Sequence, residues 1–148
     1  EKDSHLKETA VRETQEEVGV SLEEQAFLGG LNAHSPRMAK DSFIIQPFLF
    51  ALDKRPELKL DSKEVDRVHF IEMKHLLNLN LYGMKKFSFR EKRDISLPAF
   101  EFEGVVVWGV TYVILMDFLS RLAQLPEFRG HFQSERWQAL FTAFPYRT

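Results

Sequence analysis

Three glutamates near the start of the chain, at positions 13, 16 and 17, have the spacing of one helix face. At about 100° per residue, a helix places Glu13, Glu16 and Glu17 within one sector of about 100°. Like charges at these spacings repel, so a packed helix would need a counter-charge for them. A hard divalent cation suits this role, because Mg²⁺ prefers carboxylate oxygen together with water and phosphate. Arg12 can pair with Glu16 and fix its rotamer. The alternative is an ordinary acidic helix face in solvent.

The element that must carry these carboxylates is predicted as a helix over residues 6–18. No Pro or Gly interrupts this segment, and Asp3 or Ser4 can cap its first turn. Gly19 follows directly and can close the helix in the left-handed conformation. The helix would therefore present all three carboxylates on its last two turns.

The rest of the chain is predicted to combine short strands, loops and a second long helix. Strands are expected over residues 27–31, 42–52, 64–71 and 105–108, with Pro47 limiting the second of them to an edge or a bulge. Loops are expected over 32–41 and 82–97, a short helix or turn over 72–79, and a helix over 111–125. The mixture of elements favours an α+β fold or an α/β/α sandwich.

Composition excludes several classes of protein. The chain has 148 residues, 20 Lys and Arg against 22 Asp and Glu, and no cysteine. A cysteine-free chain has neither a disulfide framework nor a thiolate zinc site, and cytoplasmic residence fits this composition. A near-neutral charge without a basic block argues against a nucleic-acid module. The apolar run over 104–116 is shorter than the roughly 20 residues of a membrane span, so no membrane contact is expected.

The acidic helix and the residues that follow it resemble a known signature. The pattern Arg-Glu-x-x-Glu-Glu-x-Gly-aliphatic resembles the second half of the Nudix box of Nudix hydrolases, and it covers Arg12, Glu13, Glu16, Glu17, Gly19 and Val20. Two positions depart from the generic box, with Thr14 in place of a bulky aliphatic residue and Ser4 in place of a glutamate. The box also begins with a glycine that would precede Glu1, so we expect the chain to start inside the signature.

These departures resemble one branch of the family, the coenzyme A pyrophosphatase-like proteins, in which an Asp precedes a Thr-Ala-aliphatic-Arg-Glu sequence. Here Asp3 precedes the segment 9–13. Three later stretches resemble that branch and occur in the same order. The first is 28–31, the second is 64–65 leading into 70–71 and 76–77, and the third is 107–111. The resemblance runs from Asp3 to about Leu122.

The resemblance implies roles for individual residues. Glu13 and Glu17 would be the main ligands of Mg²⁺ or Mn²⁺, and Glu16 would be a further ligand or would orient the water that attacks phosphorus. Arg12 would orient these carboxylates. Glu64 is a second candidate, because relatives open a late strand with Glu-Val. A structural role for Glu64, such as capping or pairing with Arg67, is an equal alternative.

The resemblance also implies a fold and a function. The fold would be a Nudix-type α/β/α sandwich with a mixed sheet whose first strands are missing here, with a domain over 1–123 and a helical C-terminal extension over 124–148. The function would be metal-dependent hydrolysis of the diphosphate linkage of a small nucleotide derivative, with coenzyme A or a related compound as the best choice. The alternatives are a different nucleoside diphosphate derivative or a non-catalytic nucleotide-binding module. A homodimer is compatible with the resemblance.

Overall fold

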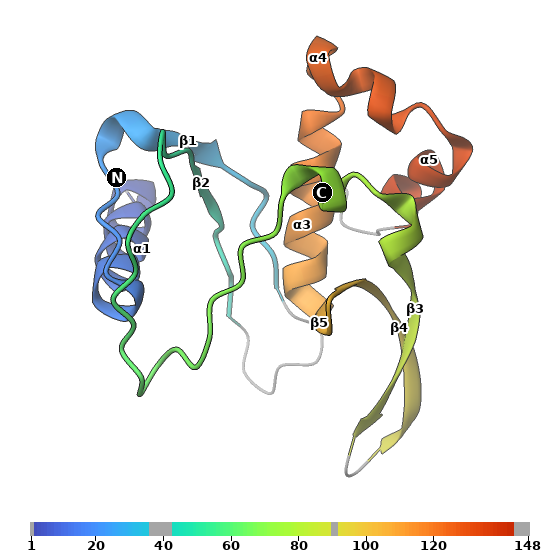
Figure 1. The fold of residues 1–148 in the computed structure, drawn as a ribbon, viewed down its shortest axis with the longest axis horizontal. Coiled ribbons are helices and arrows are strands. Elements are labelled where there is room, and N and C mark those ends of the chain that lie inside the picture. Colours follow the sequence, from blue (N-terminus) through green and yellow to red (C-terminus); the bar gives the residue numbers. More distant parts are fainter. Residues whose placement is uncertain (1, 36–42, 90–91, 144–148) are drawn as a thin grey trace. The chain divides into compact units, whose positions relative to one another are not determined.

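The three glutamates lie in helix α1 (Lys2–Val18), the first element of the computed structural model (Figure 1). The structure describes residues 2–35, 43–89 and 92–143. The predicted helix is confirmed, but it already includes Asp3 and Ser4, so neither residue precedes it as a cap. The side chains of residues 2–4 lie outside the described part. Gly19 follows the helix with a φ of 75° and donates its N–H to the carbonyl of Gln15, as the left-handed closure requires.

The chain divides into two units, and the first comprises residues 1–35 and 44–70. Besides α1 it contains a single 3-10 turn, η1 (Glu24–Ala26), and two short strands, β1 (Phe27–Gly30) and β2 (Phe48–Phe50). The strands pair antiparallel, and the ring of Phe27 lies 5.3 Å from that of Phe50 between centroids. The strand expected over 42–52 is thus confined to the residues after Pro47. Residues 36–42, which include most of the expected loop, lie outside the described part.

The strand expected over residues 64–71 is absent, and this prediction is wrong. The segment begins in a turn instead, because the N–H groups of Glu64 and Val65 both donate to the carbonyl of Asp61, at 3.1 and 2.8 Å. These bonds fold the chain back at the point where a strand would have to be extended. Without any strand pairing, Val65 and Val68 become half-buried and Phe70 stays exposed.

The second unit contains the larger sheet. A short helix α2 (Met73–Leu76) and a 3-10 turn η2 (Leu79–Leu81) lead into β3 (Tyr82–Phe89), β4 (Lys92–Phe102) and β5 (Val105–Trp108). The strands form one antiparallel sheet in the order β3-β4-β5. The helix or turn over 72–79 and the strand over 105–108 are confirmed.

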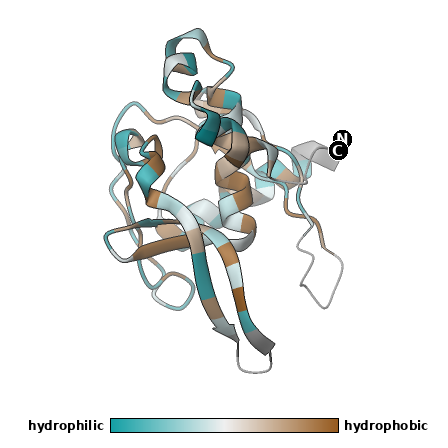
Figure 2. Ribbon diagram, turned by 90° about the vertical axis from the view of Figure 1, so that its right-hand side faces the viewer, coloured by the Kyte–Doolittle hydropathy of each residue, from teal (hydrophilic) through white to brown (hydrophobic). Residues whose placement is uncertain are grey.

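The loop expected over residues 82–97 is wrong, because this segment belongs to β3 and β4. Its polar and basic residues suggested a loop, but polar and apolar residues alternate over 86–89 and 94–97, as the bands along the two strands in Figure 2 show. Alternation with period two lets one ribbon have a polar and an apolar face. Lys86 pairs opposite Ser96 on the polar face, and Lys85, opposite Leu97 on the other face, forms an ion pair with Glu101.

Two features fix the register of this sheet. Glu103 and Gly104 have φ angles of 48° and 81°, the combination of a two-residue hairpin turn, and they join Phe102 to Val105. The flanking pair exchanges hydrogen bonds, so alternate residues of β4 turn their N–H toward β5. Counting back by twos from Phe102, Phe100 is the next position on that side and Pro98 the one after it, and Pro98 lacks an N–H. Pairing with β5 ends one residue earlier, where Ala99 faces Trp108.

Helix α3 (Gly109–Leu122) packs on the sheet and confirms the helix expected over 111–125. Three short helical elements follow, α4 (Pro126–Arg129), η3 (Gly130–Phe132) and α5 (Glu135–Thr142), and the hydroxyl oxygen of Ser134 accepts a hydrogen bond from the N–H of Trp137 at the start of α5. The core of the unit joins residues from β3, β4, α3, η3 and α5: Tyr82, Phe100, Tyr112, Met116, Leu119, Phe132 and Trp137.

The structure therefore combines helices with antiparallel sheets, as the α+β prediction required. The predicted division at residue 123 stays a prediction. Within the described ranges, none of the helices has the length and apolar character needed to cross a membrane.

Candidate functional site

The guanidinium of Arg12 joins two of the three predicted site carboxylates. Its Nη1 donates to Oε2 of Glu16 at 2.7 Å, and its Nη2 donates to Oε1 of Glu13. These bonds, first the one with Glu16 and then the one with Glu13, raise the pKa of Arg12 above its ordinary value. The pairing of Arg12 with Glu16 that the spacing predicted is present, and Arg12 contacts Glu13 as well.

The carboxylates remain accessible to a ligand from solvent. The side chains of Glu13 and Glu16 are 44% and 57% exposed, and Glu17 is half-buried. Arg12 uses one oxygen each of Glu13 and Glu16, so the second oxygen of each carboxylate is not engaged by that arginine. The helix face therefore offers several hard oxygen donors.

This donor set fits a divalent cation that is only partly coordinated by protein. Among the described residues, no three His, Asp or Glu side chains converge closely enough to enclose a metal ion. Mg²⁺ does not require such a cage, because it usually keeps several waters and binds one or two carboxylates together with substrate phosphates. The face of α1 suits that mode of binding.

The first half of α1 is tied to the strand pair of the same unit. Lys7 donates from Nζ to Glu24 Oε2 at 2.7 Å, and the same ammonium lies 4.6 Å from the ring centroid of Phe27. The aliphatic stem of Lys7 is largely covered, with 21% of the side chain exposed. An ion pair and a cation–π contact thus orient the helix through a residue that the sequence did not single out.

The end of α1 is held by a segment about forty residues further along the chain. The N–H of Lys59 donates to the carbonyl of Val18 at 2.9 Å, and the N–H of Asp61 donates to the carbonyl of Glu17 at 2.8 Å. The approach is close at Gly19, where an added Cβ would lie 2.8 Å from Cβ of Lys59. Glycine is required here by both its φ and its neighbour.

Glu64 lies in the turn that follows this segment, and its residue is exposed. Its N–H donates to the carbonyl of Asp61, so its main chain is linked to that of Glu17 through one intervening residue. Its carboxylate does not converge with two of the other acidic or histidine side chains of the described residues. No ion pair of the described residues joins Glu64 to Arg67, so the pairing considered for these two is not observed.

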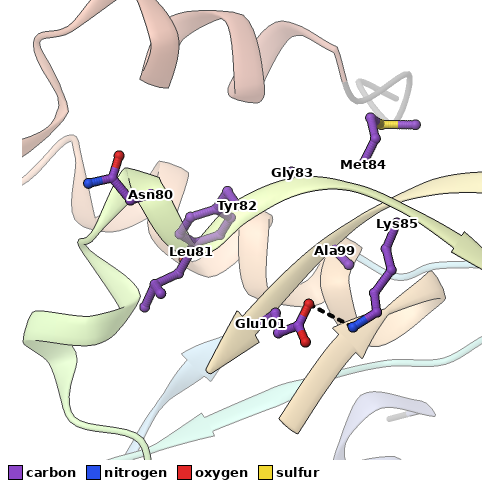
Figure 3. A pocket seen from close by; sticks show the side chains of 8 residues that line it. All are labelled: Asn80, Leu81, Tyr82, Gly83, Met84, Lys85, Ala99 and Glu101. Atoms are coloured by element: carbon purple, nitrogen blue, oxygen red, sulfur yellow. Dashed lines mark ion pairs between the residues drawn. The ribbon is translucent and has the colours of Figure 1, made fainter. Parts of the chain in front are cut away.

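A pocket of about 340 Å³ lies in the second unit, beside the edge strand β3 (Figure 3). Gly83 and Ala99 lie beside it, and Lys85 and Glu101 turn toward each other with Nζ and Oε2 2.6 Å apart. None of the predicted metal ligands lines this pocket. Glu101 flanks the apolar strand and is engaged in an ion pair on the sheet surface.

Sequence reasoning missed two contributors to the site region, Lys7 and Asp61. Lys7 looked like one exposed charge among many, and its partner Glu24 is seventeen positions away. Asp61 offered only the weak signal of an Asp-Ser pair in a charged segment, which is typical of a turn.

Comparisons with known proteins agree with the predicted resemblance. A family model described as NUDIX domain matches residues 1–91. The chain is 33% identical over 125 residues to "Mitochondrial coenzyme A diphosphatase NUDT8" of Homo sapiens, which covers 82% of this chain and 51% of that protein. The mouse protein of the same name is 32% identical over 124 residues, and the match covers 82% of this chain and 57% of that protein. "Peroxisomal coenzyme A diphosphatase NUDT7" of Mus musculus is 28% identical over 117 residues, and the match covers 79% of this chain and 47% of that protein.

The chain spans about half the length of the curated relatives that it matches. No solved structure matches it significantly. The family match includes the whole of α1, with Arg12 and the three glutamates, and the segment that holds the end of this helix. Because the match extends over more than half of the chain, the chain belongs to the NUDIX domain family.

Proposed function

We propose that the protein is a metal-dependent hydrolase that cleaves the diphosphate linkage of a nucleotide derivative. The observation that carries this proposal is the face of α1, where Arg12 holds Glu13 and Glu16 beside Glu17. These four residues occupy the matching positions of the family signature. A helix selected only for stability would avoid three mutually repelling carboxylates.

Each of these residues has a separate role in the proposed reaction. Glu13 and Glu17 are the main ligands of a divalent cation, Mg²⁺ or Mn²⁺, and Glu16 is a further ligand or orients the attacking water. When bound, the cation neutralises charge on the diphosphate oxygens and favours formation of a nucleophile at neutral pH. Arg12 keeps the carboxylates of Glu13 and Glu16 in place through its two hydrogen bonds. Glu64 is a lower-ranked candidate for the same site.

Coenzyme A or a related compound is the proposed substrate. The support comes from the printed names of the relatives, all three of which are coenzyme A diphosphatases. Identity of about one third leaves room for another nucleoside diphosphate derivative, so a panel of such compounds decides between them. The predicted cytoplasmic location and the homodimer stay predictions, and the names of the relatives assign those proteins to mitochondria or peroxisomes.

The test replaces one carboxylate at a time in the full-length protein. Glu17→Gln, and separately Glu13→Gln, should lower Mg²⁺-dependent turnover of coenzyme A by a factor on the order of 10²–10³, because each loses a charged oxygen ligand while the amide keeps the shape. Release of the phosphorylated products, measured by chromatography, gives the rate. The melting temperature should stay close to that of the wild type.

Glu8→Gln is the matched control, since Glu8 lies on the same helix, is 70% exposed and pairs with His5 instead of Arg12. It should turn over substrate like the wild type. Normal Mg²⁺-dependent activity in Glu17→Gln would refute the assignment of this helix face. Tight binding of nucleotide derivatives without any phosphate-containing product would favour the non-catalytic alternative.

A further inference from the structure

The segment of residues 59–65, called the strap below, joins the last turn of α1 to Glu64. The last carbonyls of a helix have no partner within the helix. The strap supplies two such hydrogen-bond partners, because the N–H groups of Lys59 and Asp61 donate to the carbonyls of Val18 and Glu17 at 2.9 and 2.8 Å. The final turn, which carries Glu17, is therefore held by residues that are distant in sequence.

Asp61 is the centre of the strap. Its N–H reaches Glu17, and its carbonyl accepts the N–H groups of Glu64 and Val65 at 3.1 and 2.8 Å. Its side-chain Oδ1 accepts the N–H of Lys63 at 2.9 Å, an Asp-centred turn that fixes the direction of the chain. One residue thus connects the main chains of both parts of the candidate site.

The contact at Gly19 shows that this arrangement is tight. An added Cβ would lie 2.8 Å from Cβ and 3.0 Å from N of Lys59, so the strap lies directly against the end of the helix. The first half of α1 is held by the ion pair of Lys7 with Glu24. With both parts of the helix fixed, the direction in which Glu17 projects depends on the geometry of the strap.

We infer that Asp61 is a positioning residue of the metal site, whose side chain shapes the strap so that Glu17 and Glu64 keep their places on either side of it. This inference rests on the proposed function, because it assumes that Glu17 binds a divalent cation. Asp61 itself acts as a hydrogen-bond acceptor in this role. Its negative charge is not required.

Three variants of the full-length protein test whether Asp61 acts through its hydrogen-bond acceptor or through its charge. Asp61→Ala removes the acceptor and the charge, whereas Asp61→Asn keeps the acceptor oxygen and removes only the charge. Asp66→Ala is the matched control, since Asp66 is exposed in the same region and is not part of the strap. The probe is Mn²⁺ alone, titrated without substrate and followed by electron paramagnetic resonance. Hydrogen exchange of the Lys59 and Asp61 amides and the melting temperature are measured in parallel.

Asp61→Ala should bind Mn²⁺ about tenfold more weakly, which is the lower range for loss of a residue that orients a metal ligand. Its Lys59 and Asp61 amides should exchange faster. Asp61→Asn should stay within about twofold of the wild type, because Asn forms the same turn, and Asp66→Ala should not differ from the wild type.

Unchanged Mn²⁺ affinity in Asp61→Ala, with faster exchange or a lower melting temperature, would reduce the strap to a structural element and overturn the inference. Equal weakening in Asp61→Asn would show that the charge matters, and would overturn it as well. A wild-type protein that binds Mn²⁺ but cleaves neither coenzyme A nor any other nucleoside diphosphate derivative of the panel would refute the proposed function alone. The comparison of Mn²⁺ affinities would still decide the role of Asp61.

Discussion

Each of the two units of the molecule is stabilised internally by a different kind of contact. In the second unit, aromatic and aliphatic side chains from five elements form one buried cluster. In the first unit, the buried residues among those described are few, Val20, Leu31 and His34, and directional contacts hold α1 instead. The difference follows from the side chains that the helix carries, because charged carboxylates cannot be packed into an apolar core. Hydrogen bonds and ion pairs fix such a helix while leaving its charged face accessible.

The largest effect on stability is expected in the packed unit. Trp137 is 1% exposed, and its ring lies 5.0 Å from that of Phe132 and 5.2 Å from that of Tyr82 between centroids. Trp137→Ala should lower the free energy of unfolding by about 3–5 kcal/mol, because it removes a large buried side chain and leaves a cavity. Urea unfolding followed by circular dichroism measures this loss.

Trp108→Ala serves as its control, because Trp108 is 38% exposed and its ring lies 4.5 Å from that of Phe87 between centroids, in a tilted arrangement. It should cost about 0.5–1.5 kcal/mol for the lost ring pair, plus a burial contribution smaller than that of Trp137, because more of Trp108 is already in solvent. Equal losses for the two tryptophans would contradict the description of this unit as held by its core.

A smaller effect is expected where the strap meets α1. Gly19→Ala places a side chain at a φ of 75° and within 2.8 Å of Lys59, so it should cost about 1–3 kcal/mol. Gly83→Ala is the matched comparison, since Gly83 has no positive φ and no atom within 4 Å of its added Cβ. It should be close to neutral. Thermal unfolding of both variants tests whether a backbone contact is as important in the first unit as packing is in the second.

The smallest effect is a pH dependence that belongs to the packed unit. Burial raises the pKa of Tyr112 to about 12, whereas an unfolded tyrosine titrates near 10. Between these values the unfolded chain has released the proton and the folded chain keeps it, so stability is complete below about pH 10 and falls as the pH rises. The loss should be on the order of 1 kcal/mol by about pH 11.

Urea unfolding midpoints between about pH 8 and pH 11 measure this fall. In Tyr112→Phe the fall should be shallower without vanishing, because burial also raises the pKa of the neighbouring Tyr82. A slope that does not change in Tyr112→Phe would show that other groups cause the alkaline destabilisation.

The sequence predicted those parts of the fold that depend on local patterns. Helix α1, its closure at Gly19 and the pairing of Arg12 with Glu16 all follow from residues within one or two turns of each other. The change from β5 to α3 at Gly109 was equally clear, because β-branched residues give way to helical spacing there.

Features that depend on distant residues were not predictable in this way. The strap contacts α1 through main-chain groups, which any residue type provides, so no side-chain pattern indicates it. The segment 64–71 begins in the turn at Asp61 instead of the expected strand, and the polar and basic residues of the ribbon of β3 and β4 suggested a loop. Whether Glu13, Glu16, Glu17 and Glu64 bind metal stays a prediction.

Pro98 has a consequence for how this sheet meets other chains. Its ring nitrogen faces the side of β4 on which pairing with β5 has ended, so the next strand position there offers no donor. Beyond this point no strand of the described residues pairs with this side of β4, and unpaired strand borders favour pairing with strands of other molecules. A proline at the first free position interrupts that ladder and limits the growth of aggregates from this border.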